Sequence, residues 1–91
     1  MTDTEPSTLD VLAKAVARAA NALGMPDDYL PPDPVAFVRS YKLIDGLLGD
    51  QAAIWFHVSN PRLGSAPAKL AETSVGLRWI CEYLEAMRGT A

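Results

Sequence analysis

Residues 26–34 constrain the fold most strongly, because four of these nine residues are proline. A proline has no backbone N–H to donate, and it biases the residue before it away from the α region. A regular helix or an interior strand therefore cannot run through this segment. The sequence predicts an extended linker here, with separate elements on either side.

Helical patterns flank the linker. Apolar residues at helical spacing predict a helix over about 8–23, with Ser7 or Thr8 as its N-cap. Asp33, followed by a proline in the first turn, is a typical helix start and opens a second helix over about 34–48.

Three more helices are predicted in the C-terminal half. A helix over about 51–58 takes Asp50 as its cap, and a short one over about 67–72 begins with a proline. The last helix, about 74–88, takes Thr73 or the next serine as its cap. Because no segment alternates with the period of a strand, we expect an all-α fold: a small single-domain bundle of about five helices.

The composition of the chain excludes several classes of function. The chain has 91 residues, a formal charge of −3, one cysteine and one histidine. Such a chain supports one core with little room for a deep cofactor cavity, and it cannot form a disulfide framework or a closed zinc site of Cys and His ligands. We therefore expect no cofactor and no metal. The acidic start is unlike a signal peptide and no apolar run is long enough to span a membrane, so we expect a cytoplasmic protein without a membrane partner.

The candidates for catalysis have simpler interpretations. Cys81 falls on the apolar stripe of the last helix, where a thiol usually packs as a small hydrophobe. His57 falls near the end of the third helix, where a cation suits the helix dipole. Asp27 and Asp28 are adjacent acids without a third ligand for a cation. We expect that the protein is not an enzyme.

The segment 59–67 predicts a structured turn. Asn60 can bond its own backbone, Leu63 can fill the core beneath the turn, and Gly64 permits a positive φ. Pro67 then starts the next helix. We interpret this turn as a lock that fixes the angle between two helices.

The last helix carries a second face. Trp79 and Tyr83 are four residues apart, so they share one side of the helix. That side is rotated by roughly 100–200° from the apolar stripe. Large rigid aromatic side chains dominate interface hot spots, so we interpret the pair as part of a partner interface. A second packing surface within the protein is the alternative.

Several segments together resemble the toxin-binding domain of the Xre/MbcA/ParS antitoxins, over about residues 35–89. These segments are Phe37-Val-Arg-Ser-Tyr-Lys, Leu47-Leu-Gly-Asp-Gln-Ala with Trp55, Asn60-Pro-Arg-Leu-Gly-Ser-Ala-Pro67, and Gly76-Leu with Glu82-Tyr-Leu-Glu-Ala-Met-Arg-Gly89. The resemblance implies a small helical bundle that binds and neutralises a RES-domain toxin, an enzyme that consumes NAD. It also implies that the C-terminal region of the antitoxin occludes the active site of the toxin.

The resemblance implies different roles for different residues. The shaping of the domain falls to a structural signature: Trp55, Asn60, Leu63, Gly64 and Pro67. We expect toxin contact from four residues of the last helix: Trp79, Tyr83, Arg88 and Gly89. The arginine and the glycine match the C-terminal end that approaches the toxin in the family, and the aromatic pair would flank them. An arginine there can form charge-assisted bonds in an NAD site.

The segment Ala15-Val-Ala-Arg-Ala-Ala-Asn-Ala-Leu-Gly24 resembles the first helix of the helix-turn-helix that such antitoxins often carry. With the linker it forms an N-terminal part, 1–33, which we interpret as the remnant of a truncated helix-turn-helix. We expect residues 34–91 to form the toxin-binding domain. The linker is too short and too rich in proline for the two helices that would follow in a helix-turn-helix, and its acidic residues would repel DNA phosphates. We therefore do not expect this chain to bind DNA.

The leading hypothesis is an antitoxin of a type II toxin–antitoxin system whose partner is a RES-domain toxin. A DNA-binding repressor of the same family and a helical scaffold module that associates only with itself are the alternatives. Assembly into a homodimer also stays open.

Overall fold

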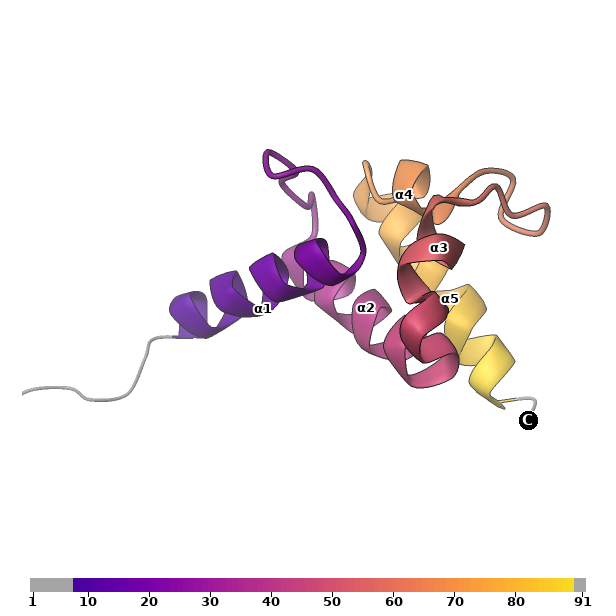
Figure 1. The fold of residues 1–91 in the computed structure, drawn as a ribbon, viewed down its shortest axis with the longest axis horizontal. Helices are drawn as coiled ribbons and strands as arrows, with labels where there is room; N and C mark the ends of the chain where they lie inside the picture. The colour runs from indigo at the N-terminus through magenta and orange to yellow at the C-terminus, as the bar shows by residue number, and fades with distance from the viewer. Residues whose placement is uncertain (1–7, 90–91) are drawn as a thin grey trace, which may run out of the picture.

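The computed structural model describes residues 8–89, which fold into five α-helices and one 3₁₀ turn (Figure 1). In chain order these are α1 (Thr8–Ala22), α2 (Pro34–Leu48), η1 (Gly49–Gln51), α3 (Ala52–His57), α4 (Pro67–Leu70) and α5 (Ser74–Gly89). Over this range no strand forms, and one isolated bridge pairs Asn60 with Ser65 within a turn. The prediction of an all-α fold is confirmed.

A single hydrophobic core joins the helices. α2 packs against both α1 and α5, and α4 lies against α5 (Figure 1). The largest fully buried apolar side chains of this core come from α2, α3, α5 and the residue that follows α1: Leu23, Phe37, Ile44, Phe56, Leu77, Ile80 and Leu84. Burying one such side chain contributes about 1.5–3 kcal/mol. The described residues therefore form one globule.

Several helix ends follow the signals in the sequence. The Asp33 side chain accepts a hydrogen bond from the Ala36 N–H at 3.1 Å and caps α2. Thr73 Oγ1 accepts from the Gly76 N–H at 2.9 Å and caps α5 in the same way. Gly24, with φ +70°, ends α1 in a Schellman motif. The N-cap of α1 predicted at Ser7 or Thr8 lies outside the residues whose side chains the structure describes.

Asp50 does not cap the third helix, so that prediction is wrong. Gly49, with φ +53°, ends α2, and the chain turns at once through η1 into α3. The residue before α3 is Gln51, which has helical backbone angles and makes no capping bond with its side chain. An N-cap side chain needs extended backbone to reach the first turn, and the 3₁₀ turn leaves no such residue.

The proline-rich linker is largely exposed, but it is not extended throughout, because it contains a turn and is attached to the core at Tyr29. The Tyr29 N–H donates to the Pro26 carbonyl at 3.0 Å and forms a turn. The Tyr29 ring packs on Phe37 with ring centroids 5.1 Å apart, and its hydroxyl donates to the Ala71 carbonyl at 2.7 Å. Burial, reinforced by the nearby charge of Glu72, raises the pKa of Tyr29 to about 12. One tyrosine therefore anchors the linker to the core.

Replacing Tyr29 with phenylalanine should lower the free energy of unfolding by about 1 kcal/mol, because the ring packing stays while the hydrogen bond to Ala71 is lost. The pKa of Tyr29 is higher in the folded state than in the unfolded chain, so its contribution is complete below pH 10 and falls as the pH rises towards about 12. Urea unfolding at pH 7 and at alkaline pH measures both effects. In the Tyr29→Phe variant, the fall in the free energy of unfolding at alkaline pH should be smaller, because the variant lacks the phenol that ionises. Tyr41→Phe is the control, because it removes a half-buried phenol elsewhere.

α4 meets α5 at a glycine. Gly76 is buried in the first turn of α5, and a Cβ atom at this position would overlap the carbonyl group of Leu70 at the end of α4. The overlapping atoms belong to backbone, which cannot move aside as a flexible side chain would. Gly76 is therefore required by the close approach of the two helices.

Replacing Gly76 with alanine should destabilise the protein by about 1–3 kcal/mol, the usual cost of forcing extra atoms into a packed site. The matched control is Gly46→Ala in α2, where a Cβ would meet nothing within 4 Å. That change should raise stability by up to about 1 kcal/mol, because alanine is the better helix former. Thermal unfolding compares the two variants, and equal stabilities would show that Gly76 has no packing role.

Candidate functional site

α5 has two distinct faces. Its apolar stripe of Leu77, Ile80 and Leu84 is completely buried in the core. Trp79 lies off this stripe and is 49% exposed, whereas Tyr83, one turn further along, is half-buried. The structure thus places the two aromatic residues on the second face of α5, but in different environments.

Tyr83 is held by another aromatic ring. The rings of Trp55 in α3 and Tyr83 in α5 stack with centroids 6.4 Å apart and an angle of 6° between their planes. Both residues also pack against the core. The stack joins α3 to α5 and fixes the position of the Tyr83 ring, so Trp79 is the aromatic residue of this face with the larger area free for a partner.

Two open grooves flank Trp79. The larger, about 370 Å³, runs between the 60–65 turn, α4 and α5, and Leu63, Val75 and Arg78 are among its lining residues. The smaller, about 200 Å³, is lined by Trp79, Glu82 and Tyr83. Glu82 lines both grooves and supplies a carboxylate beside the indole ring. We refer to Trp79, its two grooves and Glu82 as the Trp79 face.

The turn after α3 forms one wall of this face. The Asn60 carbonyl accepts from the Gly64 N–H at 2.9 Å, and the Asn60 side chain accepts from the Arg62 N–H at 3.0 Å. Gly64 has φ +86°, a backbone conformation that favours glycine. Leu63 is buried within the turn and lines the larger groove. The predicted turn geometry is confirmed, and Pro67 begins α4 as expected.

Arg88 and Gly89 lie apart from the Trp79 face. Both are exposed in the last turn of α5. Arg88 follows Trp79 by nine residues, which corresponds to about 13 Å along the helix axis and about half a turn around it. The aromatic pair therefore does not flank the arginine, and the four predicted contact residues form two separate groups.

Sequence reasoning did not assign Val75, Leu63 or Glu82 to this face. Val75 lies one helical turn before Trp79 and is 76% exposed, and Leu63 reaches the larger groove from the turn. The spacing of Val75, Trp79 and Tyr83 by four residues each was a usable signal for a second stripe on α5. The position of Leu63 had no such signal, because it depends on how the turn folds onto α5.

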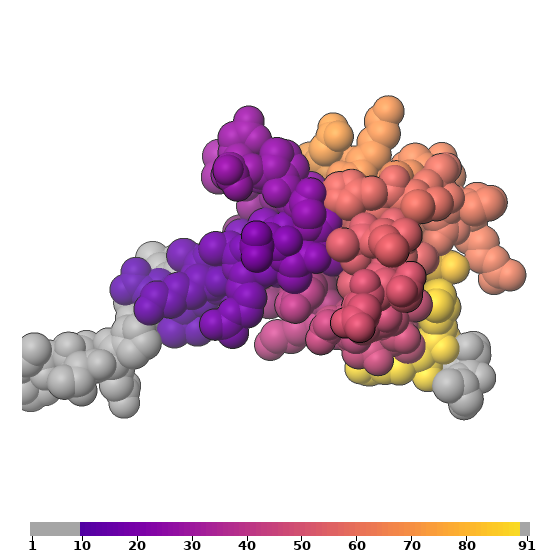
Figure 2. Space-filling view, in the orientation of Figure 1, coloured from indigo at the N-terminus to yellow at the C-terminus, as the bar shows by residue number. Residues whose placement is uncertain are grey.

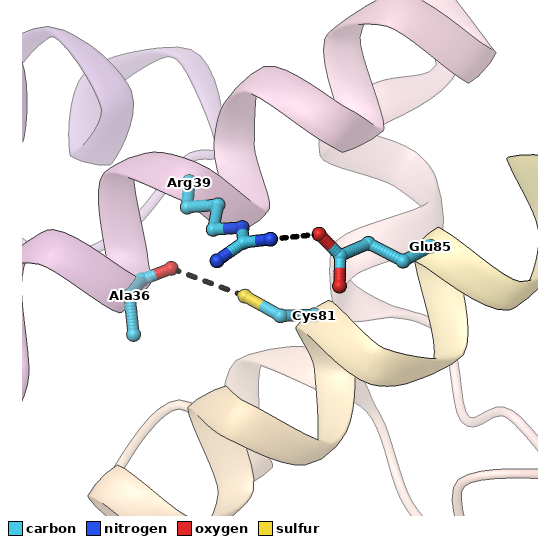
Figure 3. Close-up of polar contacts among 4 residues, drawn as sticks. All are labelled: Ala36, Arg39, Cys81 and Glu85. Atoms are coloured by element: carbon cyan, nitrogen blue, oxygen red, sulfur yellow. Dashed lines mark hydrogen bonds and ion pairs between the residues drawn. The ribbon is translucent and has the colours of Figure 1, made fainter.

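Cys81 is packed between helices, as predicted. Its Sγ lies 3.4 Å from the Ala36 carbonyl oxygen, beside an ion pair that joins Arg39 of α2 to Glu85 of α5 (Figure 3). Burial raises the pKa of the Cys81 thiol, and the positive charge of Arg39 only partly opposes this effect. The thiol is therefore held in its protonated, weakly nucleophilic form.

His57 has a structural contact that the sequence did not reveal. It is the last residue of α3, and its Nε2 lies 2.7 Å from the Leu23 carbonyl oxygen at the end of α1. The imidazole thus satisfies a carbonyl group that α1 leaves without a helical partner.

Asp27 and Asp28 are exposed, and within residues 8–89 no group of three or more His, Cys, Asp or Glu residues is arranged to hold a metal ion. No helix in this range has the length and apolar character needed to cross a bilayer.

Comparison with known protein families gives a match for the C-terminal half of the chain. Residues 45–89 match the model of the antitoxin Xre/MbcA/ParS C-terminal toxin-binding domain. This part of the chain belongs to that family. The toxin-binding domain so defined includes the 60–65 turn and α3, α4 and α5, and hence the whole Trp79 face, whereas α1 and the linker lie outside it. A search of curated proteins found no match to the chain.

Proposed function

We propose that this protein is an antitoxin that binds a RES-domain toxin through the Trp79 face and blocks its consumption of NAD by steric occlusion. The observation that carries the proposal is the half-exposed Trp79 between two open grooves in a domain that belongs to a toxin-binding family. The identity of the toxin as a RES-domain enzyme rests on the sequence resemblance.

The chemistry of the face suits a protein partner. Trp79 and Val75 offer a continuous apolar surface on one side of α5, and the larger groove beside them can accept an apolar side chain. Tryptophan is enriched among hot-spot residues because it brings a large contact area and few rotatable bonds. Glu82 adds a carboxylate at the edge, where a basic residue of the toxin could pair with it.

We assign inhibition of the toxin to the second group of predicted contact residues, Arg88 and Gly89. Arg88 and Gly89 end α5, away from the grooves, and the chain continues beyond them to Ala91. We expect this end to reach the NAD pocket of the toxin, where the guanidinium group can bond to groups that hold phosphate. Because the anchoring face and the C-terminal end are about 13 Å apart along α5, binding and inhibition should be separable.

Replacing Trp79 with alanine should weaken toxin binding by about 2 kcal/mol, roughly 30-fold in Kd, while circular dichroism shows an intact fold. The exposed indole makes this the cleanest variant. Tyr83→Ala should weaken binding and also lower stability, because it breaks the stack on Trp55. Isothermal titration with the purified toxin measures the effect. The control is Ile54→Ala, which removes an exposed apolar side chain that lines neither groove.

Deleting residues 89–91 should restore much of the toxin's NAD consumption while the two proteins still co-purify. The hot spots lie upstream of the deletion, so the complex should hold together without the C-terminal end. An NAD assay on the co-expressed, purified pair tests this, with Arg88→Ala as a smaller change of the same end. Complete inhibition after the deletion, together with normal binding by the Trp79 variant, would place the toxin on another face.

Two other functions compete with this proposal. A DNA-binding repressor would need a recognition helix, and the eleven residues from Leu23 to Asp33 that follow α1 contain turns but no helix. A scaffold that only self-associates would leave the Trp79 face without a toxin partner. A gene for a RES-domain protein beside the gene for this chain would favour the antitoxin over both.

A further inference from the structure

Two charged side chains of opposite sign lie beside Trp79. Arg78 and Glu82 are the charged residues that line the larger groove, and both are exposed on α5. Helical geometry places them on the same side of Trp79, at about 100° and about 60° from it around the axis. They are about 6 Å apart along the axis. One side of the groove therefore carries a basic group followed by an acidic group.

These two charges contribute little to the fold. Arg78 and Glu82 form no ion pair with each other in the part of the chain that the structure describes. The basic residue precedes the acidic one by four positions, which is the less favourable order for such a pair on a helix. By contrast, Glu85 of the same helix is paired with Arg39 of α2 (Figure 3). Arg78 and Glu82 are therefore open to a partner.

The groove lies away from the N-terminal helix. Figure 2 shows the 60–65 turn, which walls the larger groove, protruding on one side of the molecule, whereas α1 extends towards the opposite side. The charged residues of α1 are thus remote from the groove. A partner seated on Trp79 meets the charges of α5 itself.

A partner that covers Trp79 also covers both charges, because all three residues line one groove. Removing a charged group from water is costly unless a group of opposite sign meets it. A purely apolar partner surface would leave a guanidinium group and a carboxylate without counter-charges. The surface that binds here must therefore carry charged groups as well as an apolar anchor.

We propose, on the basis of the antitoxin function proposed above, that Arg78 and Glu82 determine which toxin surface the Trp79 face accepts and in which orientation. The contact surface of the toxin carries an apolar side chain for the groove, a carboxylate that meets Arg78 and a cation that meets Glu82. The carboxylate and the cation are about 6 Å apart, as on the antitoxin. A surface turned end for end, or one with the opposite order of charges, brings like charges together and is rejected.

Exchanging the two charges tests their order directly. The double variant Arg78→Glu/Glu82→Arg keeps the composition and the net charge of −3, and it gives the pair the better order for a helix. In thermal unfolding it should be at least as stable as the unmodified chain. In isothermal titration with the purified RES-domain toxin it should nevertheless bind at least about tenfold more weakly, because each charge would meet a like charge.

Salt distinguishes repulsion from a folding defect. Toxin binding by the unmodified chain should weaken between about 0.05 M and about 0.5 M salt, whereas binding by the exchanged variant should improve, because salt screens attraction and repulsion alike. The matched control is Lys42→Asp/Asp45→Lys, which exchanges two exposed charges on α2 that line neither groove of the Trp79 face. The control should leave the Kd and its salt dependence unchanged.

Trp79→Ala, measured in the same titrations, separates this assignment from the antitoxin proposal. If Trp79→Ala weakens binding but the exchanged variant binds normally, the antitoxin function stands and the roles of Arg78 and Glu82 are wrong. A control exchange that weakens binding as much would also overturn these roles, because the effect would not depend on contact at the groove. If neither Trp79→Ala nor the exchange has an effect, or if the unmodified chain does not bind the toxin, both proposals are wrong.

Discussion

The packing of α5 on α2 supports the rest of this structure. Leu77, Ile80 and Leu84 of α5 share one buried cluster with Phe37 and Ile44 of α2. α1 packs on α2, and α4 lies against α5. The positions of α1 and α4 therefore depend on the packing of α2 on α5. The Arg39–Glu85 ion pair also joins α2 to α5, but both side chains are substantially exposed, and such pairs contribute little. Apolar burial between α2 and α5 therefore determines where both outer helices lie.

Local signals predicted several helix ends because the interactions that form them are local. Asp33 and Thr73 each bond an N–H three residues later, and Gly24 supplies a left-handed residue at the end of α1. Contacts between distant segments left no such signal. Tyr29 bonds a carbonyl 42 residues away, and His57 bonds one 34 residues away. The prolines around Tyr29 predicted an extended linker, because no nearby residue in the sequence indicates that Tyr29 bonds to Ala71.

The candidate site shows the same difference between features that local sequence predicts and features that depend on distant segments. Helical periodicity was enough to place Trp79 and Tyr83 on one side of α5, away from the buried stripe. Periodicity also implies that Arg88 lies about half a turn from Trp79, although the family resemblance had suggested that the residues act side by side. The stack on Trp55 comes from α3, and the groove wall formed by Leu63 comes from the turn. Neither contact could be predicted from the periodicity of α5, because each depends on how a distant segment folds onto that helix.

The Trp79 face and the first half of α1 differ in how the core supports them. The Trp79 face is built on α5 and on the turn that Gly64 and Asn60 hold in shape, so its geometry is fixed before a partner arrives. Such preorganisation lowers the ordering cost of binding and favours a specific partner. The first half of α1 is less well supported, because it has no buried residue among its described side chains. A contact there would stabilise the helix itself, so its binding free energy includes the ordering of α1.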